Sequence, residues 1–128
     1  MQDNAFDSQP FPVPSRSRGP LSQEDQDACV QEIVRRIVAG FNPKRVFLFG
    51  SRARGDHHAD SDVDLLVEVE GRPDPFKLGV DMRRAVFRSP LGKDIVVVLR
   101  DDWEGRAKST FDIVRYAMDD GAVCLHER

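Results

Sequence analysis

Hydrophobic positions along this chain follow two kinds of spacing, which separate predicted helices from predicted strands. Behind Ser22, a residue suited to cap a helix, apolar residues recur at helical spacing as far as Gly40, the predicted stop. These positions are Ala28, Cys29, Ile33, Ile37 and Val38. Continuous apolar runs follow at residues 45–49, 63–69 and 95–99 and predict three strands, the first of them covered on both faces.

Two more helices and a last strand are predicted in the second half of the chain. Asp74 and Pro75 suit the N-cap and first turn of a helix that covers the sheet, with apolar positions at Phe76, Leu78, Val80, Met82, Val86 and Phe87. Asp101 or Asp102 is expected to cap a final helix that ends at Gly121, before a short edge strand at residues 122–125. That helix would carry Trp103, Ala107, Phe111, Val114, Tyr116 and Met118, with Trp103 and Tyr116 in the core. The order of elements predicts one small α/β domain.

The first 20 residues contain Pro10, Pro12, Pro14 and Pro20 and show no sustained hydrophobic period. Such a composition predicts a disordered tail over residues 1–20, with the folded domain at residues 21–128. The alternative is that Phe6, Phe11 and Val13 dock on a partner or on the domain itself.

Composition narrows the class of protein. A chain of 128 residues with a net charge of −3 has room for one modest core and no basic excess for bulk nucleic-acid binding. No apolar stretch approaches the roughly 20 residues that cross a bilayer, and the N-terminus lacks the order of a signal peptide. Cys29 and Cys124 lack metal-ligand spacing and are interpreted as reduced core residues, with a disulfide left open. A cytoplasmic protein with no membrane association is therefore expected.

Acidic residues mark the starts of two predicted strands. Asp62 and Asp64 are two positions apart, so in an extended segment their side chains point to the same face, with Cα atoms about 6 to 7 Å apart. Asp94 opens the run Lys93 to Leu99 and is placed to complete the cluster. Clustered carboxylates repel one another, and divalent cations offset that repulsion. The pattern predicts a Mg²⁺ site, with two ions expected, for displacement at phosphorus.

Gly50 and Ser51 close the first strand, and ten residues separate them from Asp62. The absence of a Cβ at Gly50 lets a phosphate approach the backbone, and Ser51 offers a hydroxyl and an N–H at the start of a short predicted helix. Arg52 and Arg54 are candidates for bidentate phosphate binding; the alternative for each is a solvent-exposed helix position. Gly50, Ser51, Arg52 and Arg54 are therefore the predicted nucleotide-binding residues.

The Gly-Ser pair, the ten-residue spacer, Ser61-Asp62-Val63-Asp64 and the later Asp94 together resemble a known pattern. It is that of the DNA polymerase beta-like nucleotidyltransferase superfamily and, within it, of the minimal nucleotidyltransferases, over roughly residues 22–125. The resemblance implies a small nucleotidyltransferase fold with a mixed β-sheet flanked by helices. It also implies that Asp62, Asp64 and Asp94 bind Mg²⁺ and are catalytic, with ATP as substrate and Asp94 helping to deprotonate the acceptor hydroxyl.

The chain is further similar to minimal nucleotidyltransferases that act as antitoxins. In these, AMP is transferred from ATP to a tyrosine hydroxyl of a HEPN-domain toxin, so the resemblance implies a HEPN partner in a hetero-oligomer. Two alternatives stay open: an antitoxin that neutralises its partner by binding alone, and a transferase for a small molecule or an RNA end. The intact acid triad counts against the first, while the small size and acidic charge count against the second.

Overall fold

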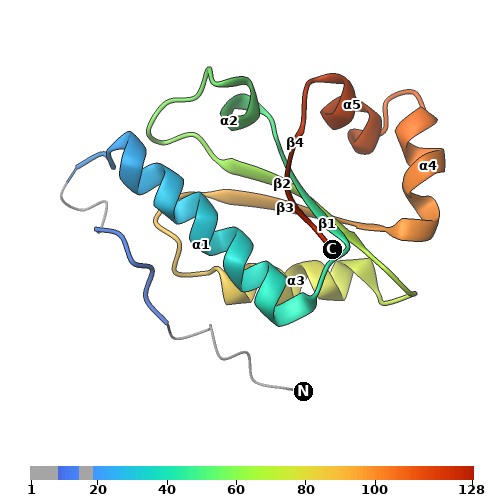
Figure 1. The fold of residues 1–128 in the computed structure, drawn as a ribbon, viewed down its shortest axis with the longest axis horizontal. Helices are drawn as coiled ribbons and strands as arrows, with labels where there is room; N and C mark the ends of the chain where they lie inside the picture. The colour runs from blue at the N-terminus through green and yellow to red at the C-terminus, as the bar shows by residue number, and fades with distance from the viewer. Residues whose placement is uncertain (1–8, 15–18) are drawn as a thin grey trace.

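The computed structural model describes residues 9–14 and 19–128, which fold around one β-sheet (Figure 1). The sheet has the strand order β3-β2-β1-β4, made of β1 (Arg45–Phe49), β2 (Val63–Val69), β3 (Lys93–Leu99) and β4 (Val123–Glu127). β2 and β3 are parallel, while β1 is antiparallel to both β2 and β4. The sheet is therefore mixed, as expected.

Helices cover both faces of this sheet. α1 (Gln23–Phe41) and α3 (Pro75–Ala85) lie on one face, and α4 (Arg100–Lys108) and α5 (Ile113–Asp119) lie on the other (Figure 1). The short helix α2 (Ser51–Arg54) directly follows β1. The prediction of a small α/β domain whose mixed sheet is flanked by helices is confirmed.

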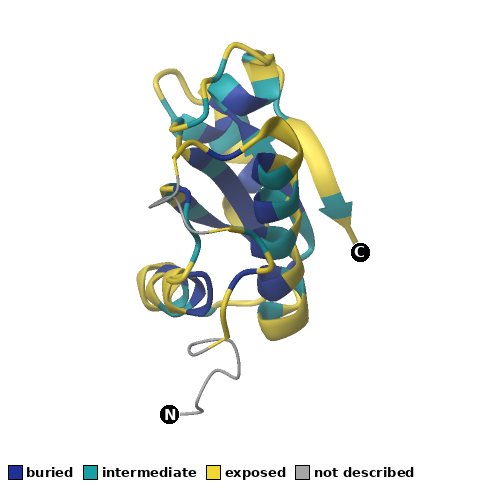
Figure 2. Cartoon of the chain, turned by 90° about the vertical axis from the view of Figure 1, so that its left-hand side faces the viewer, coloured by how far each residue is buried: buried dark blue, intermediate teal, exposed yellow. Residues whose placement is uncertain are grey.

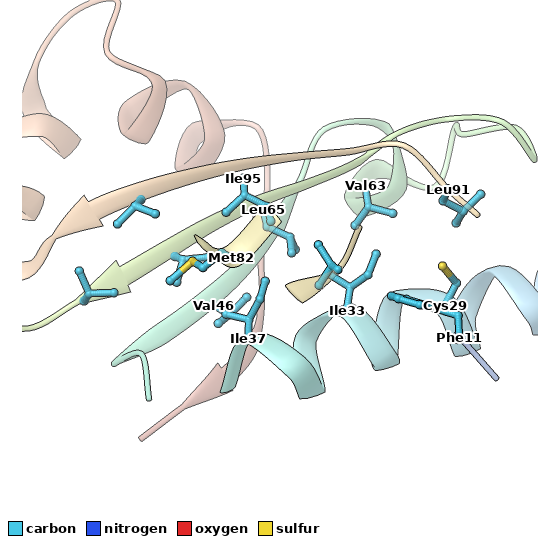
Figure 3. Close-up of a cluster of buried hydrophobic side chains, with 14 of the residues drawn as sticks. Phe11, Cys29, Ile33, Ile37, Val46, Val63, Leu65, Met82, Leu91 and Ile95 are labelled. Carbon is cyan, nitrogen blue, oxygen red and sulfur yellow. The ribbon is translucent and has the colours of Figure 1, made fainter. Parts of the chain in front are cut away.

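The alternation of side chains along the strands divides the core in two. Val63, Leu65 and Val67 of β2 pack with α1 and α3 in the cluster that Figure 3 shows. Leu66, from the same strand, packs on the other face with Trp103 of α4 and residues of α5. By the same alternation, Asp64 lies on the α4/α5 face.

α1 forms where the helical spacing predicts it. The Ser22 hydroxyl accepts a hydrogen bond from the Asp25 N–H at 3.1 Å, and Cys29, Ile33 and Ile37 are buried against the sheet (Figure 3). The helix ends at Phe41, just beyond the predicted stop, because Asn42 adopts the left-handed conformation and donates its N–H to the Val38 carbonyl.

α3 confirms its predicted cap but not its predicted buried face. The Asp74 carboxylate accepts from the N–H groups of Phe76 and Lys77, and Pro75 takes the first helical position. Phe76, Val80 and Phe87, however, are exposed, whereas Met82 and Val86 are buried. The expectation that the whole apolar set covers the sheet is wrong, because residues 76, 78, 80 and 82 alternate at a period of two and no helix face can hold them all.

The predicted final helix is two helices. The chain leaves α4 after Lys108, and Phe111 adopts a positive φ of 69° with its side chain fully exposed. A new N-cap follows, since the Asp112 carboxylate accepts from the Val114 N–H at 2.9 Å and starts α5. The cap of α4 is Leu99 instead of Asp101 or Asp102. Tyr116 is exposed, against expectation, whereas Trp103 is buried and stacks on Phe47 with ring centroids 5.4 Å apart.

The described part of the N-terminal segment lies against the domain. Phe11 is buried with the core residues, and the Arg36 guanidinium lies 4.2 Å from its ring centroid. Arg36 also donates to the carbonyls of Gln9 and Pro10 at 3.1 and 2.9 Å. For Phe11, docking on the domain is the alternative that the structure supports. Phe6 and the rest of residues 1–8 and 15–18 lie outside the described residues.

The two cysteines occupy different environments. Cys29 is buried, whereas Cys124 is exposed on the edge strand β4, so the core interpretation is correct for the first and wrong for the second. Both are free thiols. Figure 2 shows β4 exposed along most of its length. None of the helices in the described residues is long and apolar enough to cross a membrane.

Candidate active site

The turn between β1 and α2 brings Gly50 against Asp64. Gly50 has a φ of 75°, which favours glycine, and a Cβ built there would collide with Oδ2 of Asp64. The Gly50 carbonyl accepts from the N–H groups of Ala53 and Arg54 at 3.1 Å each. Ser51 is half-buried at the start of α2. The turn and the acidic residue therefore lie next to each other.

The strand register brings the acidic residues together. Asp64 and Asp94 are partners across the parallel β2–β3 pair, and both lie at the N-terminal ends of their strands. Asp62 immediately precedes β2, and a Cβ built at Gly92 would collide with its Oδ1. The Val63 N–H donates to the Gly92 carbonyl at 2.8 Å, which fixes this approach. Asp62, Asp64 and Asp94 thus lie at one edge of the sheet, beside the β1–α2 turn.

Electrostatics confirms that these carboxylates affect one another. Burial raises the pKa of Asp64, and the negative charges of Asp94 and Asp62 raise it further. The cations Arg54 and Arg52 act in the opposite direction and with less effect. Within the described part of the chain, however, no three His, Cys, Asp or Glu side chains are arranged to hold a metal ion. The acids are near enough for repulsion but are not drawn around a common point.

Arg52 faces inward. Its side chain is buried, and its Nε and Nη2 donate to the Ser61 carbonyl at 3.1 and 2.8 Å. Its Nη1 donates to Oε1 of Gln26 at 3.1 Å, so the guanidinium bridges the acidic loop and α1. Burial lowers the pKa of Arg52, and neighbouring acidic groups including Asp62 oppose that change. The structure does not direct this predicted nucleotide-binding residue toward solvent.

Arg54 is partly exposed and is held by two carboxylates. Its Nη1 donates to Oδ2 of Asp120 at 2.5 Å, and its Nε donates to Oδ2 of Asp56 at 3.2 Å. Hydrogen bonds to Asp120 and then Asp56 raise the pKa of Arg54, so it remains a cation. It differs from Arg52 in that its guanidinium is partly exposed at the surface.

Two residues of this region were not predicted from the sequence. Gly92 leaves the space that the Asp62 carboxylate fills, and Gln26 connects Arg52 to the Leu21 carbonyl through its own Nε2, at 2.8 Å. The sequence signal for Gly92 was its place two residues before Asp94. Gln26 carried no comparable signal, because a glutamine in the first turns of a helix is ordinary.

Comparison with protein families gives one match that covers most of the described domain. A family model described as "Nucleotidyltransferase domain" matches residues 30–111, which include the β1–α2 turn and the three acidic residues. Among curated protein sequences, none matches this chain significantly.

Comparison with solved structures gives two matches of interest. A candidate nucleotidyltransferase from Sulfolobus solfataricus, solved at 1.40 Å, is 28% identical, with a TM-score of 0.51 and 78% of each chain covered. A structure described as a toxin–antitoxin with AMP-PNP is 20% identical, with a TM-score of 0.48, covering 77% of this chain and 73% of its own.

Proposed function

Because this chain belongs to the nucleotidyltransferase domain family, we propose that it transfers AMP from ATP to a tyrosine hydroxyl of a HEPN-domain toxin. In this proposal it acts as a cytoplasmic antitoxin and forms a hetero-oligomer with its target. The observation that carries the proposal is the contact of the Gly50–Ser51 turn with Asp64, next to Asp62 and Asp94. A Gly-Ser turn and clustered carboxylates at one end of the sheet suit a triphosphate and its cations.

The three carboxylates have the chemistry that a divalent cation requires, although their side chains are not gathered around one point in the described structure. The negative charges of Asp94 and Asp62 raise the pKa of Asp64, and a cation between these groups would relieve that repulsion. Carboxylate oxygens are also the ligands that Mg²⁺ prefers in proteins. When bound, Mg²⁺ supplies positive charge that neutralises the phosphates and stabilises the displacement at phosphorus. Asp62, Asp64 and Asp94 would hold it.

The residues of the chain have separate tasks in this proposal. Gly50 and the Ser51 N–H and hydroxyl bind the distal phosphates, and Arg54 joins them from the surface of α2. Asp94 accepts the proton of the acceptor hydroxyl. The acceptor oxygen forms a bond to the α-phosphorus, while the bond from that phosphorus to the β-bridging oxygen breaks. Pyrophosphate leaves with the electron pair.

The choice of a protein acceptor rests on the resemblance of the segment from Gly50 to Asp64 to minimal nucleotidyltransferases. Of the two arginines of α2, Arg52 is engaged with the Ser61 carbonyl, which leaves Arg54, paired with Asp56 and Asp120, for the triphosphate. A nucleic-acid acceptor requires a basic surface, and the net charge of −3 does not favour one. A protein hydroxyl makes no such demand.

The test is transfer of label from α-³²P-ATP, with Mg²⁺, to the protein encoded beside this chain. We expect one labelled band at the mass of that protein, with the label on tyrosine after acid hydrolysis, and no band with γ-³²P-ATP. The matched control is Asp64→Asn, which keeps the shape of the side chain and removes its charge.

The other outcomes separate the alternatives. Absence of label together with stable binding to the neighbour would favour an antitoxin that acts by contact alone. Label on RNA or on a small molecule would place the acceptor in another class and contradict the HEPN proposal while keeping the transferase activity.

A further inference from the structure

The loop from Gly55 to Asp62 delivers the first acidic residue to the site, and it lies outside any strand. On one side of Asp62, the β2 ladder and the bond from the Val63 N–H to the Gly92 carbonyl fix the backbone. On the other side, the Ser61 carbonyl accepts two bonds from Arg52, at 2.8 and 3.1 Å. Asp62 therefore lies between backbone fixed by the strand ladder and a carbonyl group fixed by Arg52.

Arg52 is in turn held in place by a residue of α1. Gln26 is buried, accepts from Arg52 Nη1 at 3.1 Å and donates to the Leu21 carbonyl at 2.8 Å. The amide therefore uses one end to orient the guanidinium and the other to hold the chain just before α1. Nη2 of Arg52 also donates to the Ala59 carbonyl, at 3.5 Å. A buried guanidinium with its donors directed at two loop carbonyls and one amide has a defined orientation.

We propose that Arg52 is a positioning residue that sets the place of Asp62 through the Ser61 carbonyl, with Gln26 as its support, and that it does not bind phosphate. This inference rests on the proposed function, in which Asp62 is a metal ligand. It assigns the two arginines of α2 to different tasks: Arg54 faces the surface and the phosphates, and Arg52 faces the protein and shapes the acid cluster.

The deciding variant is Arg52→Lys, which keeps the positive charge but cannot make the forked contact with Ser61. If Arg52 positions Asp62, the affinity for Mn²⁺, measured by electron paramagnetic resonance of the free ion, falls about 10-fold, as for other groups that orient metal ligands. The kcat for AMP transfer falls by a similar factor, while the KM for ATP changes less than about two-fold.

A double-variant comparison tests whether the effect passes through Asp62. In an Asp62→Asn background, adding Arg52→Lys is expected to leave the remaining Mn²⁺ affinity within about two-fold, because the group it positions is gone. Gln26→Met, which keeps the side-chain length and removes the acceptor, is expected to lower Mn²⁺ affinity in the same direction by a smaller factor. Arg115→Lys, at a surface ion pair of α5 with Asp119, is the matched control.

The opposite results would overturn the proposal. A raised KM for ATP with unchanged kcat and Mn²⁺ affinity in Arg52→Lys would assign Arg52 to phosphate binding. Unchanged values throughout would remove it from both tasks, and the absence of Mn²⁺ binding by the unaltered chain would overturn the positioning role. If Arg52→Lys fails to fold, Gln26→Met decides by the same two readouts. If the unaltered chain transfers no AMP, the Mn²⁺ measurements still decide the positioning role, so failure of the proposed function is recognised separately.

Discussion

Two acidic residues on the same face of β2 have opposite surroundings. Glu68 is almost fully buried, and its carboxylate accepts from Nε and Nη2 of Arg45 at 2.6 and 3.1 Å. For Asp64, four positions earlier, burial raises the pKa most, and the negative charges of Asp94 and Asp62 raise it further. One carboxylate has a cation supplied by the fold and the other has further carboxylates. The comparison shows which acid the fold pairs with a cation of its own, and the other acid is the one that we propose to meet a ligand.

The Arg45–Glu68 ion pair is packed into the structure of the domain. The Arg45 guanidinium lies 5.0 Å from the Phe47 ring centroid and 4.8 Å from that of Trp103, so the ion pair is covered by aromatic rings. Hydrogen bonding to Glu68 raises the pKa of Arg45, which keeps the guanidinium charged. At the unpaired end, Gly50 and Gly92 leave space beside Asp64 and Asp62 where other residues would place a Cβ. The region around Glu68 is packed and its charges are paired. The region around Asp62 and Asp64 has open space beside two glycines and several negative charges close together.

The largest effect is expected from Asp64→Asn. Loss of a carboxylate that would hold Mg²⁺ removes positive charge from the transition state and costs several kcal/mol, which lowers AMP transfer by about 1,000-fold or more. The fold should not lose stability, because the change removes a charge that Asp62 and Asp94 repel. Label transfer and thermal unfolding on the same preparation measure both. Normal transfer, or a clear loss of stability, would contradict the contrast between the two ends of the face.

Glu68→Gln is expected to give the reverse result. It leaves the Arg45 cation without its counter-charge, and breaking a buried pair costs about 3 to 5 kcal/mol; because a quarter of the Arg45 side chain is exposed, we expect about 2 to 3. Urea unfolding measures the loss, with an unchanged m-value showing that the unfolding reaction is the same. Transfer per folded molecule should stay the same at a temperature where the variant is folded. Loss of transfer in a folded variant would place Glu68 in the site.

Gly92→Ala tests the reserved space with a smaller expected effect. The φ of Gly92 is not positive, so the backbone tolerates alanine, but the new Cβ must displace the Asp62 carboxylate. We expect transfer to fall about 10-fold, as when a metal ligand loses its orientation, with little change in unfolding. Gly105→Ala is the matched control, since a Cβ at that position in α4 meets nothing and should stabilise the helix by about 0.5 to 1 kcal/mol. Equal transfer in both variants would show that Asp62 needs no such space.

Much of this contrast could be predicted from local sequence, and part of it could not. The same-face placement of Asp62 and Asp64 follows from a period of two, and Gly50-Ser51 is recognisable by its spacing to them. The same period places Glu68 on that face, yet nothing in its apolar run shows whether it has a cation. That depends on the β1–β2 register, which pairs Arg45 with Glu68 and is fixed by the fold as a whole.

Neither the inward direction of Arg52 nor the helix break at Phe111 could be predicted from local sequence. Two arginines separated by one residue look alike in sequence, and only the packing of α1 decides that Arg52 meets Gln26 and Ser61. The apolar spacing from Trp103 to Met118 continues through residues 109–112, so a single helix was expected. A residue in the left-handed conformation and a second N-cap override that spacing locally.

Asp112 gives the smallest expected effect. Like Glu68, it is a carboxylate with partners inside the fold, so it should contribute to stability. Its hydrogen bond from the Val114 N–H, and then the interaction with Arg106, hold its pKa below the ordinary value of 3.8. A lowered pKa in the folded state contributes stability above pH 3.8 that is lost as the pH falls through the folded value. Asp112→Ala should therefore cost about 1 kcal/mol at pH 7, the usual value of an N-cap, and less at an acid pH well below 3.8. Urea unfolding at both pH values measures this difference, and an equal cost at both would mean that packing of the side chain, and not its charge, stabilises the start of α5.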